Sequence, residues 1–471
     1  MVAGFLTAVA PLRANRYNTC MKSMTEGRPA VLILKFSMPL LAGNLLQQMY
    51  NLVDSVVVGQ FVGKEALAAV GSTNILNFLL ISLFSGLALG FTILISQFFG
   101  AKEKDKIKRA VDTAYVVACI GAAAVTVLGL LLTEPLLSLM NTPAGPTHEM
   151  SGTYLRILFI GTIGTFGYNL NAGILQGLGD SMSSLRFLAV ATVINIVLDL
   201  VFVVVFGWGV AGVAWATVIA QAVSFLLGGL FIVRKLKLST LDPRDLEVDP
   251  RIFSEAARIG LPGGVQNMLF SLGTMAIQRL VNSYGPVYMA GFSISGRIDS
   301  VAFLPIASFA SAATTFTGQN IGANKLDRVR RGHRSVQLMS ALVCVVISLV
   351  VLLNARFLMS LFSPEEEVIL AGTEVLYRLM PCYVLLSFLF LTNSVLRGAG
   401  ESIVPFIASM TSFLFLRMPA AYLLDHFFGR SEIGWCYGIG WVFGIAIAVP
   451  YYLSGRWKKR LKTENLQKNL Q

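Results

Sequence analysis

The chain has 471 residues, of which 55% are hydrophobic and only 13% are charged. A soluble protein of this size cannot bury so large an apolar fraction, so the composition excludes an ordinary soluble domain and indicates a membrane protein. The formal net charge of +12 would also suit a nucleic-acid-binding protein, but most of the positive residues lie in alternate loops. We therefore expect no nucleic-acid partner.

Twelve apolar segments follow one another along the chain, separated by short loops that collect Gly, Pro and most of the charge. A spanning helix needs roughly 20 mostly apolar residues, because hydrocarbon offers the backbone amides no other partner. We predict an all-α integral membrane protein with twelve transmembrane helices. The expected spans are 31–60, 67–100, 110–134, 152–178, 184–206, 210–233, 253–283, 289–318, 330–356, 370–398, 402–425 and 433–456.

The loops alternate in charge. Basic residues gather in the N-terminal tail, around 102–109, 234–258 and 325–334, and after residue 456. The opposite loops hold acids such as Glu149 and Glu365. This asymmetry follows the positive-inside rule and predicts a multi-pass protein of the inner, cytoplasmic membrane with both termini in the cytoplasm.

Neither a metal centre nor an enzyme is indicated by the motifs. The cysteines are scattered and form no C-x-x-C pair, and the three histidines fall in loops. No Walker loop and no H-E-x-x-H motif is present in the sequence. We therefore predict a protein without cofactor or catalytic residues, whose only metal would be a sodium ion.

An internal repeat divides the chain, with an offset of about 222 residues. The segment 96–101 (SQFFGA) matches 318–323 (GQNIGA), and 176–180 (QGLGD) matches 397–401 (RGAGE). Because each half holds six expected spans, both halves enter the membrane from the same side and form pseudo-symmetric lobes. The predicted organisation is an N-terminal tail at 1–30, an N-lobe at 31–235, a linker at 236–252, a C-lobe at 253–457 and a C-terminal tail at 458–471.

Two acids lie inside predicted spans of the N-lobe. Asp54 is in the first span, and Asp199 is in the fifth, four residues after Asn195 and therefore on the same helical face. A carboxylate at mid-membrane costs roughly 2.5–3.5 kcal/mol, so each acid is a candidate functional residue. Together they would suit a proton or a small alkali cation. The alternative is that each acid reaches the hydrated interface, where this cost disappears.

The C-lobe offers a second set of charged candidates. Arg297 and Asp299 lie in the eighth expected span, and Arg417 lies in the eleventh. Opposite charges this close in a membrane protein form either a structural salt link or a substrate contact. We rank these three residues behind the N-lobe acids.

Taken in order, these motifs resemble the multidrug and toxic compound extrusion (MATE) family, from about residue 24 to residue 460. The segments that carry the resemblance are 39–41, 54–59, 96–101, 176–180, Asn195 with Asp199, 317–323 and 397–400. The resemblance implies two six-helix lobes in a V around a central cavity. It further implies alternating access driven by entry of protons or sodium.

The same resemblance assigns roles to residues. It implies that Asp54, Asn195, Asp199 and Thr217 bind the coupling ion, sodium included, and that the first helix bends at Pro39. One departure concerns the C-lobe. Some members carry acids in the seventh and tenth helices, where this chain has 262–268 (PGGVQNM) and Asn393 with Ser394. We therefore expect coupling through the N-lobe.

The combined prediction is a secondary active multidrug efflux antiporter. It would export amphiphilic, often cationic organic compounds in exchange for H+ or Na+, with small molecules and membrane lipids as partners and no obligate protein partner. One alternative is a flippase for lipid-linked saccharides, which would want a cationic cavity and could use Arg297 and Arg417. Another is a membrane receptor or assembly factor without a transport cycle.

Overall fold

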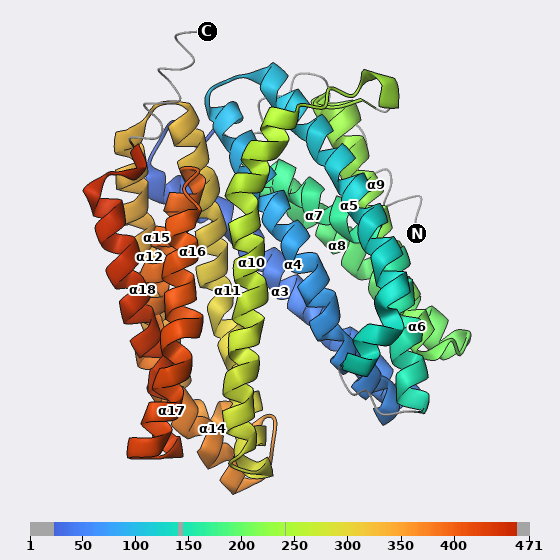
Figure 1. The fold of residues 1–471 in the computed structure, drawn as a ribbon, viewed down its shortest axis with the longest axis vertical. Helices are drawn as coiled ribbons and strands as arrows, with labels where there is room; N and C mark the ends of the chain where they lie inside the picture. Colours follow the sequence, from blue (N-terminus) through green and yellow to red (C-terminus); the bar gives the residue numbers. More distant parts are fainter. Residues whose placement is uncertain (1–22, 140–144, 241, 459–471) are drawn as a thin grey trace.

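The structure is a computed structural model that describes residues 23–139, 145–240 and 242–458. Every regular element in these ranges is a helix (Figure 1). Most of the predicted tails at 1–30 and 458–471 lies outside the described residues.

The first half of the chain forms seven α-helices and three π-helical turns. The α-helices are α3 (Pro29–Val57), α4 (Lys64–Gly100), α5 (Lys104–Leu139), α6 (Pro146–Ile160), α7 (Thr162–Gly177), α8 (Ser181–Asp199) and α9 (Gly209–Leu230). The π turns are η2 (Val58–Val62), η3 (Leu200–Val205) and η4 (Phe231–Leu236). A short 3-10 turn, η5 (Pro243–Asp245), lies in the linker.

The second half is likewise helical. Its α-helices are α10 (Pro250–Asn282), α11 (Pro286–Gly322), α12 (Leu326–Leu353), α13 (Ala355–Ser360), α14 (Glu366–Leu379), α15 (Tyr383–Gly398), α16 (Ile403–Met410), α17 (Arg417–Phe428) and α18 (Trp435–Ser454). The shorter turns are η6 (Met380–Cys382), η7 (Thr411–Leu416) and η8 (Arg430–Gly434).

Among the described residues, 10 helices are long and apolar enough to cross a membrane. An eleventh span comes from α6 and α7 together, which are bent by 53° around Gly161. The predicted span 253–283 forms the long helix α10, but this helix is too polar to pass the same test. The all-α membrane fold is thus confirmed, whereas the number of twelve spans stays a prediction.

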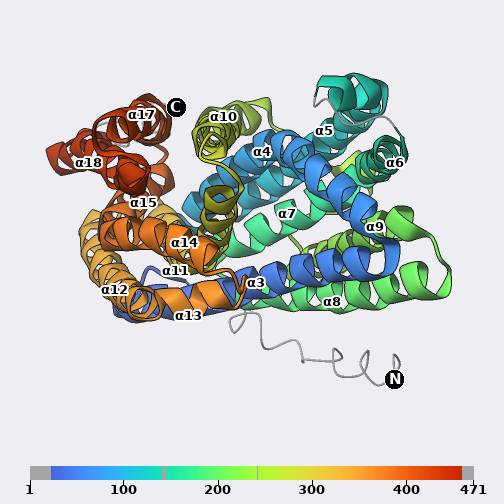
Figure 2. The ribbon, with the colours of Figure 1, turned by 90° about the horizontal axis from the view of Figure 1, so that it is seen from below.

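The helices form two groups that meet along α4 and α10 (Figures 1 and 2). The loop after α4, the linker and the loop after α11 lie at one end of the molecule, drawn at the top of Figure 1. We call this the basic end, because Lys102, Lys237 and Lys325 lie in these loops. The two groups diverge toward the other end, where α6 and α14 are far apart.

Glycines allow α4 and α10 to touch backbone to backbone. A Cβ placed on Gly260 would lie 2.2 Å from the carbonyl oxygen of Gly86, and one placed on Gly90 would lie 2.1 Å from that of Ala256. Membrane helices associate closely through such small residues, because lipid provides no hydrophobic force between them. These contacts fix the line along which the two lobes meet.

Helix α3 belongs to both lobes. Its first half carries Ile33, Phe36 and Leu40 into an apolar cluster with C-lobe residues such as Phe316 and Leu391. Its second half packs against α8 of the N-lobe, as Figure 2 shows. The predicted N-lobe at 31–235 thus begins near the start of a helix that contacts both groups.

The linker is docked on the N-lobe. Asp112 of α5 accepts hydrogen bonds from the Ser239 hydroxyl (2.5 Å) and the Glu247 amide (3.3 Å). Lys108 and Arg109 bind the Glu247 carboxylate at 2.8 and 3.0 Å. The hydrogen bond from Lys108, followed by that from Arg109, lowers the pKa of Glu247. This connector is therefore held in place at neutral pH.

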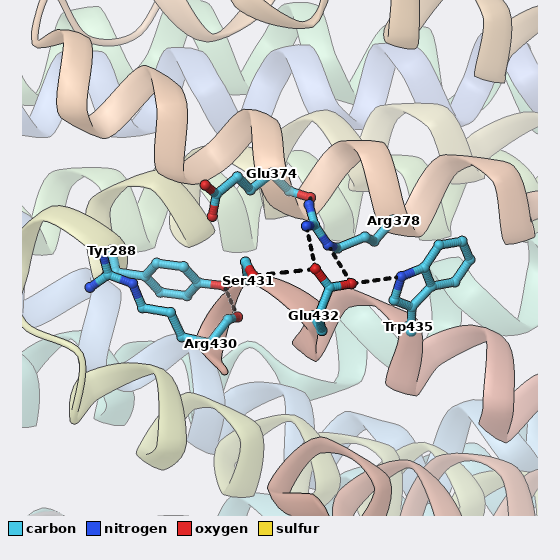
Figure 3. A network of polar contacts seen from close by, with 7 residues as sticks. All are labelled: Tyr288, Glu374, Arg378, Arg430, Ser431, Glu432 and Trp435. Atoms are coloured by element: carbon cyan, nitrogen blue, oxygen red, sulfur yellow. Dashed lines mark hydrogen bonds and ion pairs between the residues drawn. The ribbon is translucent and has the colours of Figure 1, made fainter. Parts of the chain in front are cut away.

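A polar network closes the opposite end of the C-lobe (Figure 3). Arg378 of α14 binds Glu432 through Nη2 (2.5 Å) and Nε (3.0 Å), and Trp435 donates to the same carboxylate at 3.0 Å. The Tyr288 hydroxyl donates to the Arg430 carbonyl at 3.1 Å. These bonds join α11, α14 and the start of α18.

The contact between α4 and α10 generates a stability prediction with an internal control. Gly260→Ala should lower the melting temperature of the purified protein by several degrees, because overpacking a tight contact costs about 1–3 kcal/mol. Gly263→Ala should leave it unchanged or slightly higher, because a Cβ there meets nothing nearer than Leu89 at 3.8 Å. Equal effects of the two substitutions would contradict the importance of the contact.

Candidate functional site: a polar chamber in the N-lobe

Both N-lobe acids lie where an α-helix passes into a π-helical turn. Asp54 is four residues before η2, and Asp199 is the last residue of α8, directly before η3. π turns inside helices are rare and occur frequently at functional sites. The backbone around both acids is therefore irregular in the same way.

The structure brings the two carboxyl groups together. They lie near enough to influence each other's charge, and Asp199 is fully buried. Yet Asp54 Oδ1 and both carboxylate oxygens of Asp199 are buried without a hydrogen-bond donor among the described residues. Two ionised carboxylates in this position would repel each other and lack solvation. The arrangement therefore favours a proton or a cation between them.

Asn195 and Thr217 complete the site predicted from the family resemblance. The Asn195 amide donates to Thr217 Oγ1 over 3.4 Å, and the Thr217 hydroxyl donates to the Val213 carbonyl at 3.0 Å. Asn195 Oδ1 and the nearby Thr192 Oγ1 are buried without partners. Oxygens from α3 and α8 thus converge beside α9, with more acceptors than donors.

Three adjoining hollows of about 110, 210 and 260 Å³ run through the N-lobe. The first is lined by Asp54 and Thr217, the second by Asn195 and Thr217, and the third by Pro39. The first two share Tyr50 and Gln221, and the last two share lining residues that include Gln47 and Asn169. Each hollow is large enough for water. A row of polar hollows therefore leads from Asp54 toward Pro39.

Several residues of this chamber were not predicted from the sequence. Gln47 and Tyr50 precede Asp54 by seven and four residues, so they lie on the same face of α3. That spacing could have identified them. Thr165 donates to Gln221 from another helix, and no local pattern reveals this pair.

Pro39 is buried in the chamber wall, and α3 runs through it without a break. Proline lacks the amide that would bind the carbonyl one turn earlier, so the helix is weakened there. The predicted hinge at this residue stays a prediction.

The C-lobe candidates do not form a comparable chamber. Arg297 is exposed on α11. The Asp299 carboxylate accepts a hydrogen bond from the Tyr383 hydroxyl, whereas Arg417 is 5% exposed and stacks on the Tyr437 ring at 3.6 Å. Among the ion pairs of the described residues, none joins Asp299 to either arginine. Arg417 therefore forms part of the packing of the C-lobe.

With this geometry established, comparison with known proteins identifies the family. The MatE family model matches the chain twice, at residues 39–201 and 262–423. The chain belongs to the MATE family. The double match coincides with the repeat, and it confirms the predicted pair of related halves in a MATE transporter.

Relatives of this MATE protein cover almost its whole length. It is 34% identical to the probable multidrug resistance protein YpnP of Bacillus subtilis, over 92% of this chain and 97% of that one. It is 23% identical to the probable multidrug resistance protein NorM of Thermotoga maritima, over 91% and 93%.

A solved outward-facing conformation of a multidrug resistance MATE family transporter superposes with a TM-score of 0.85 and 25% identity. The superposition covers 93% of this chain and 98% of that one. These solved structures also include a MATE in a bent conformation and one in a straight conformation, with TM-scores of 0.85 and 0.83.

The acid pair generates a prediction about stability. Asp199→Asn should raise the melting temperature at pH 8, because the new amide would donate to Asp54 and supply the missing hydrogen bond, worth about 1 kcal/mol. Asp180→Asn is the matched control, since this buried aspartate caps α8 and asparagine caps equally well. A lower melting temperature for Asp199→Asn than for the control would argue against the unpartnered pair.

Proposed function

We infer that this MATE protein is a secondary active exporter that exchanges amphiphilic, often cationic organic compounds for H+ or Na+ bound in the N-lobe. The observation that carries this inference is the pair of facing acids whose buried oxygens have no donor. Such a pair holds unfavourable charge when empty and becomes stable when a cation or proton enters. The relatives named for multidrug resistance support export of small molecules.

The geometry supports a mechanism for exchange. An entering H+ or Na+ removes one unit of negative charge from the pair Asp54 and Asp199, and the attraction of the site for a cationic compound is weakened accordingly. The ion can bias only those conformations that bind it differently. Because Asp54 is on α3 and next to a π turn, its loading state acts on the helix that contacts both lobes.

The orientation follows from charge. The basic end would face the cytoplasm under the positive-inside rule, which places both termini there in a cytoplasmic membrane. The two lobes meet at this end and diverge at the other (Figure 1). The chain would thus be in an outward-facing form, consistent with its likeness to a solved outward-facing relative.

The positions of Arg297 and Arg417 give little support to the alternative function as a flippase for lipid-linked saccharides. That function needs a strongly cationic cavity, but the Arg417 guanidinium is packed against Tyr437 and the lining of the N-lobe chamber contains no arginine or lysine. The chamber instead presents the Asp54 carboxylate and neutral polar groups. We therefore favour organic cations as substrates.

Asp54→Asn should abolish export while leaving membrane insertion intact, because the site would lose the charge that the ion neutralises. Drug resistance of expressing cells and drug flux into proteoliposomes measure the effect. Asp180→Asn should behave like the wild type. Resistance retained by Asp54→Asn at wild-type expression would refute the assignment.

Asn195→Leu should tell the two coupling ions apart. A proton needs only the two carboxyls, whereas sodium needs several oxygen ligands, and Asn195 Oδ1 is an unused one. If sodium is the coupling ion, flux driven by a sodium gradient should fall at least tenfold. If the proton is the coupling ion, flux driven by a pH gradient should stay close to the wild-type value, because both carboxyl groups remain.

A further inference from the structure

The repeated motifs at the ends of α4 and α11 have no part in the ion site, yet they meet each other at the basic end. A Cβ on Gly100 would lie 1.9 Å from the Gln319 carbonyl oxygen, and one on Gly322 would lie 1.8 Å from that of Gln97. The contact is reciprocal: each glycine touches the glutamine of the other repeat. The motifs therefore form a pseudo-symmetric crossing of two helix ends.

The glutamine side chains bind across the same crossing. Gln97 Nε2 donates to the carbonyl of Gly398 at the end of α15, and Gln319 Nε2 donates to that of Gly177 at the end of α7, both at 3.0 Å. These acceptors are themselves equivalent positions of the repeat. Each lobe thus offers one amide donor and one helix-end carbonyl to the other.

Gln319 is also bound on its acceptor side. It is fully buried, and its Oε1 accepts the Met24 amide at 2.8 Å. The two partners fix the orientation of its carboxamide, since Gly177 requires a donor and Met24 an acceptor. Gln319 therefore joins three segments: α11, α7 and the residues before α3.

The residues before α3 are held firmly on the C-lobe. Arg328 donates to the carbonyls of Met24 and Gly27 at 3.1 and 2.9 Å, and Lys325 donates to that of Thr25 at 3.0 Å. Asn320 adds a bond to Met24 at 3.2 Å. The start of α3 is thus anchored to the loop after α11, while its other end carries Asp54 into the N-lobe.

We propose that Gln97 and Gln319 are paired positioning residues that latch the two lobes together at the basic end, and that the segment 23–27 seats on Gln319 so that movement of α3 releases the latch. This proposal rests on the proposed transport cycle, in which the lobes separate at the basic end to take up substrate. Both inter-lobe bonds must then break in every cycle. The ion site reaches the latch through one helix, α3.

The test is a distance measurement across both ends of the full-length protein. Spin labels at Lys104→Cys and Arg331→Cys report the basic end, and labels at Glu149→Cys and Glu365→Cys report the opposite end, in a background without the native cysteines. All four positions are exposed. Double electron–electron resonance measures the distance distribution between the two labels of each pair. It therefore gives the populations of the two forms without any transported compound.

Gln97→Met and Gln319→Met keep the size of the side chain but remove the amide. Each should increase the population with a separated basic end about 3- to 10-fold, as expected when one buried hydrogen bond is lost from one of two states. Arg328→Met should shift it in the same direction by freeing the residues before α3. Gln→Leu substitutions replace any methionine variant that does not express.

Gln337→Met is the matched control. This buried glutamine donates to Phe388 and Thr392 within the C-lobe, so its loss removes equivalent bonds without touching the other lobe. It should leave both distances unchanged. A shift in Gln337→Met as large as in the latch variants, or unchanged distances in both Gln97→Met and Gln319→Met, would overturn the latch.

The outcome separates the latch from the proposed function. Shifted distances in a protein that exchanges no drug for protons or sodium would support the latch and refute the proposed substrates. Wild-type distances in the latch variants of a protein that does exchange them would refute the latch alone. Absence of a shift in Arg328→Met would refute the connection to α3.

Discussion

Asp54 and Asp199 face each other in a part of the N-lobe that offers their buried oxygens no donor. Asp54 Oδ1 and both oxygens of Asp199 lack a donor among the described residues, and Asp199 is fully buried, so its charged form would be costly. One of the polar hollows reaches Asp54, and a π turn begins within four residues after each acid. Under the proposed function, two ionised carboxylates would repel each other in an empty site, and an ion that enters would reduce this repulsion.

Occupancy of this site would affect both lobes, because α3 contacts both. Asp54 lies in its N-lobe half, and Ile33 and Phe36 lie in the C-lobe cluster. The glycine contact between α4 and α10 keeps the lobes in register along their length. Under the proposed exchange, a change at the acid pair would act on α3 and through it on the C-lobe.

Sequence reasoning succeeded where the signal is local. Apolar length identified the membrane helices, and the cost of a carboxylate in a span identified Asp54 and Asp199. The span predicted at 253–283 stays a prediction, because α10 is too polar to pass the test for a membrane helix, and the span predicted at 152–178 forms two helices bent at Gly161. A count of apolar residues does not reveal where a helix bends. It also cannot show whether a polar helix face is covered by other helices.

The amino-acid sequence alone determines that the fold is built of membrane helices, that the chain is duplicated, and that two acids lie within predicted spans of the N-lobe. Each of these features depends on residues near one another in the chain or on a fixed offset. Folding in three dimensions decides which oxygens lack a donor, that Arg417 stacks on Tyr437, and that Gln97 and Gln319 reach across to Gly398 and Gly177. These features join residues between 20 and more than 300 positions apart. No local pattern specifies such pairs, since their partners are chosen by packing.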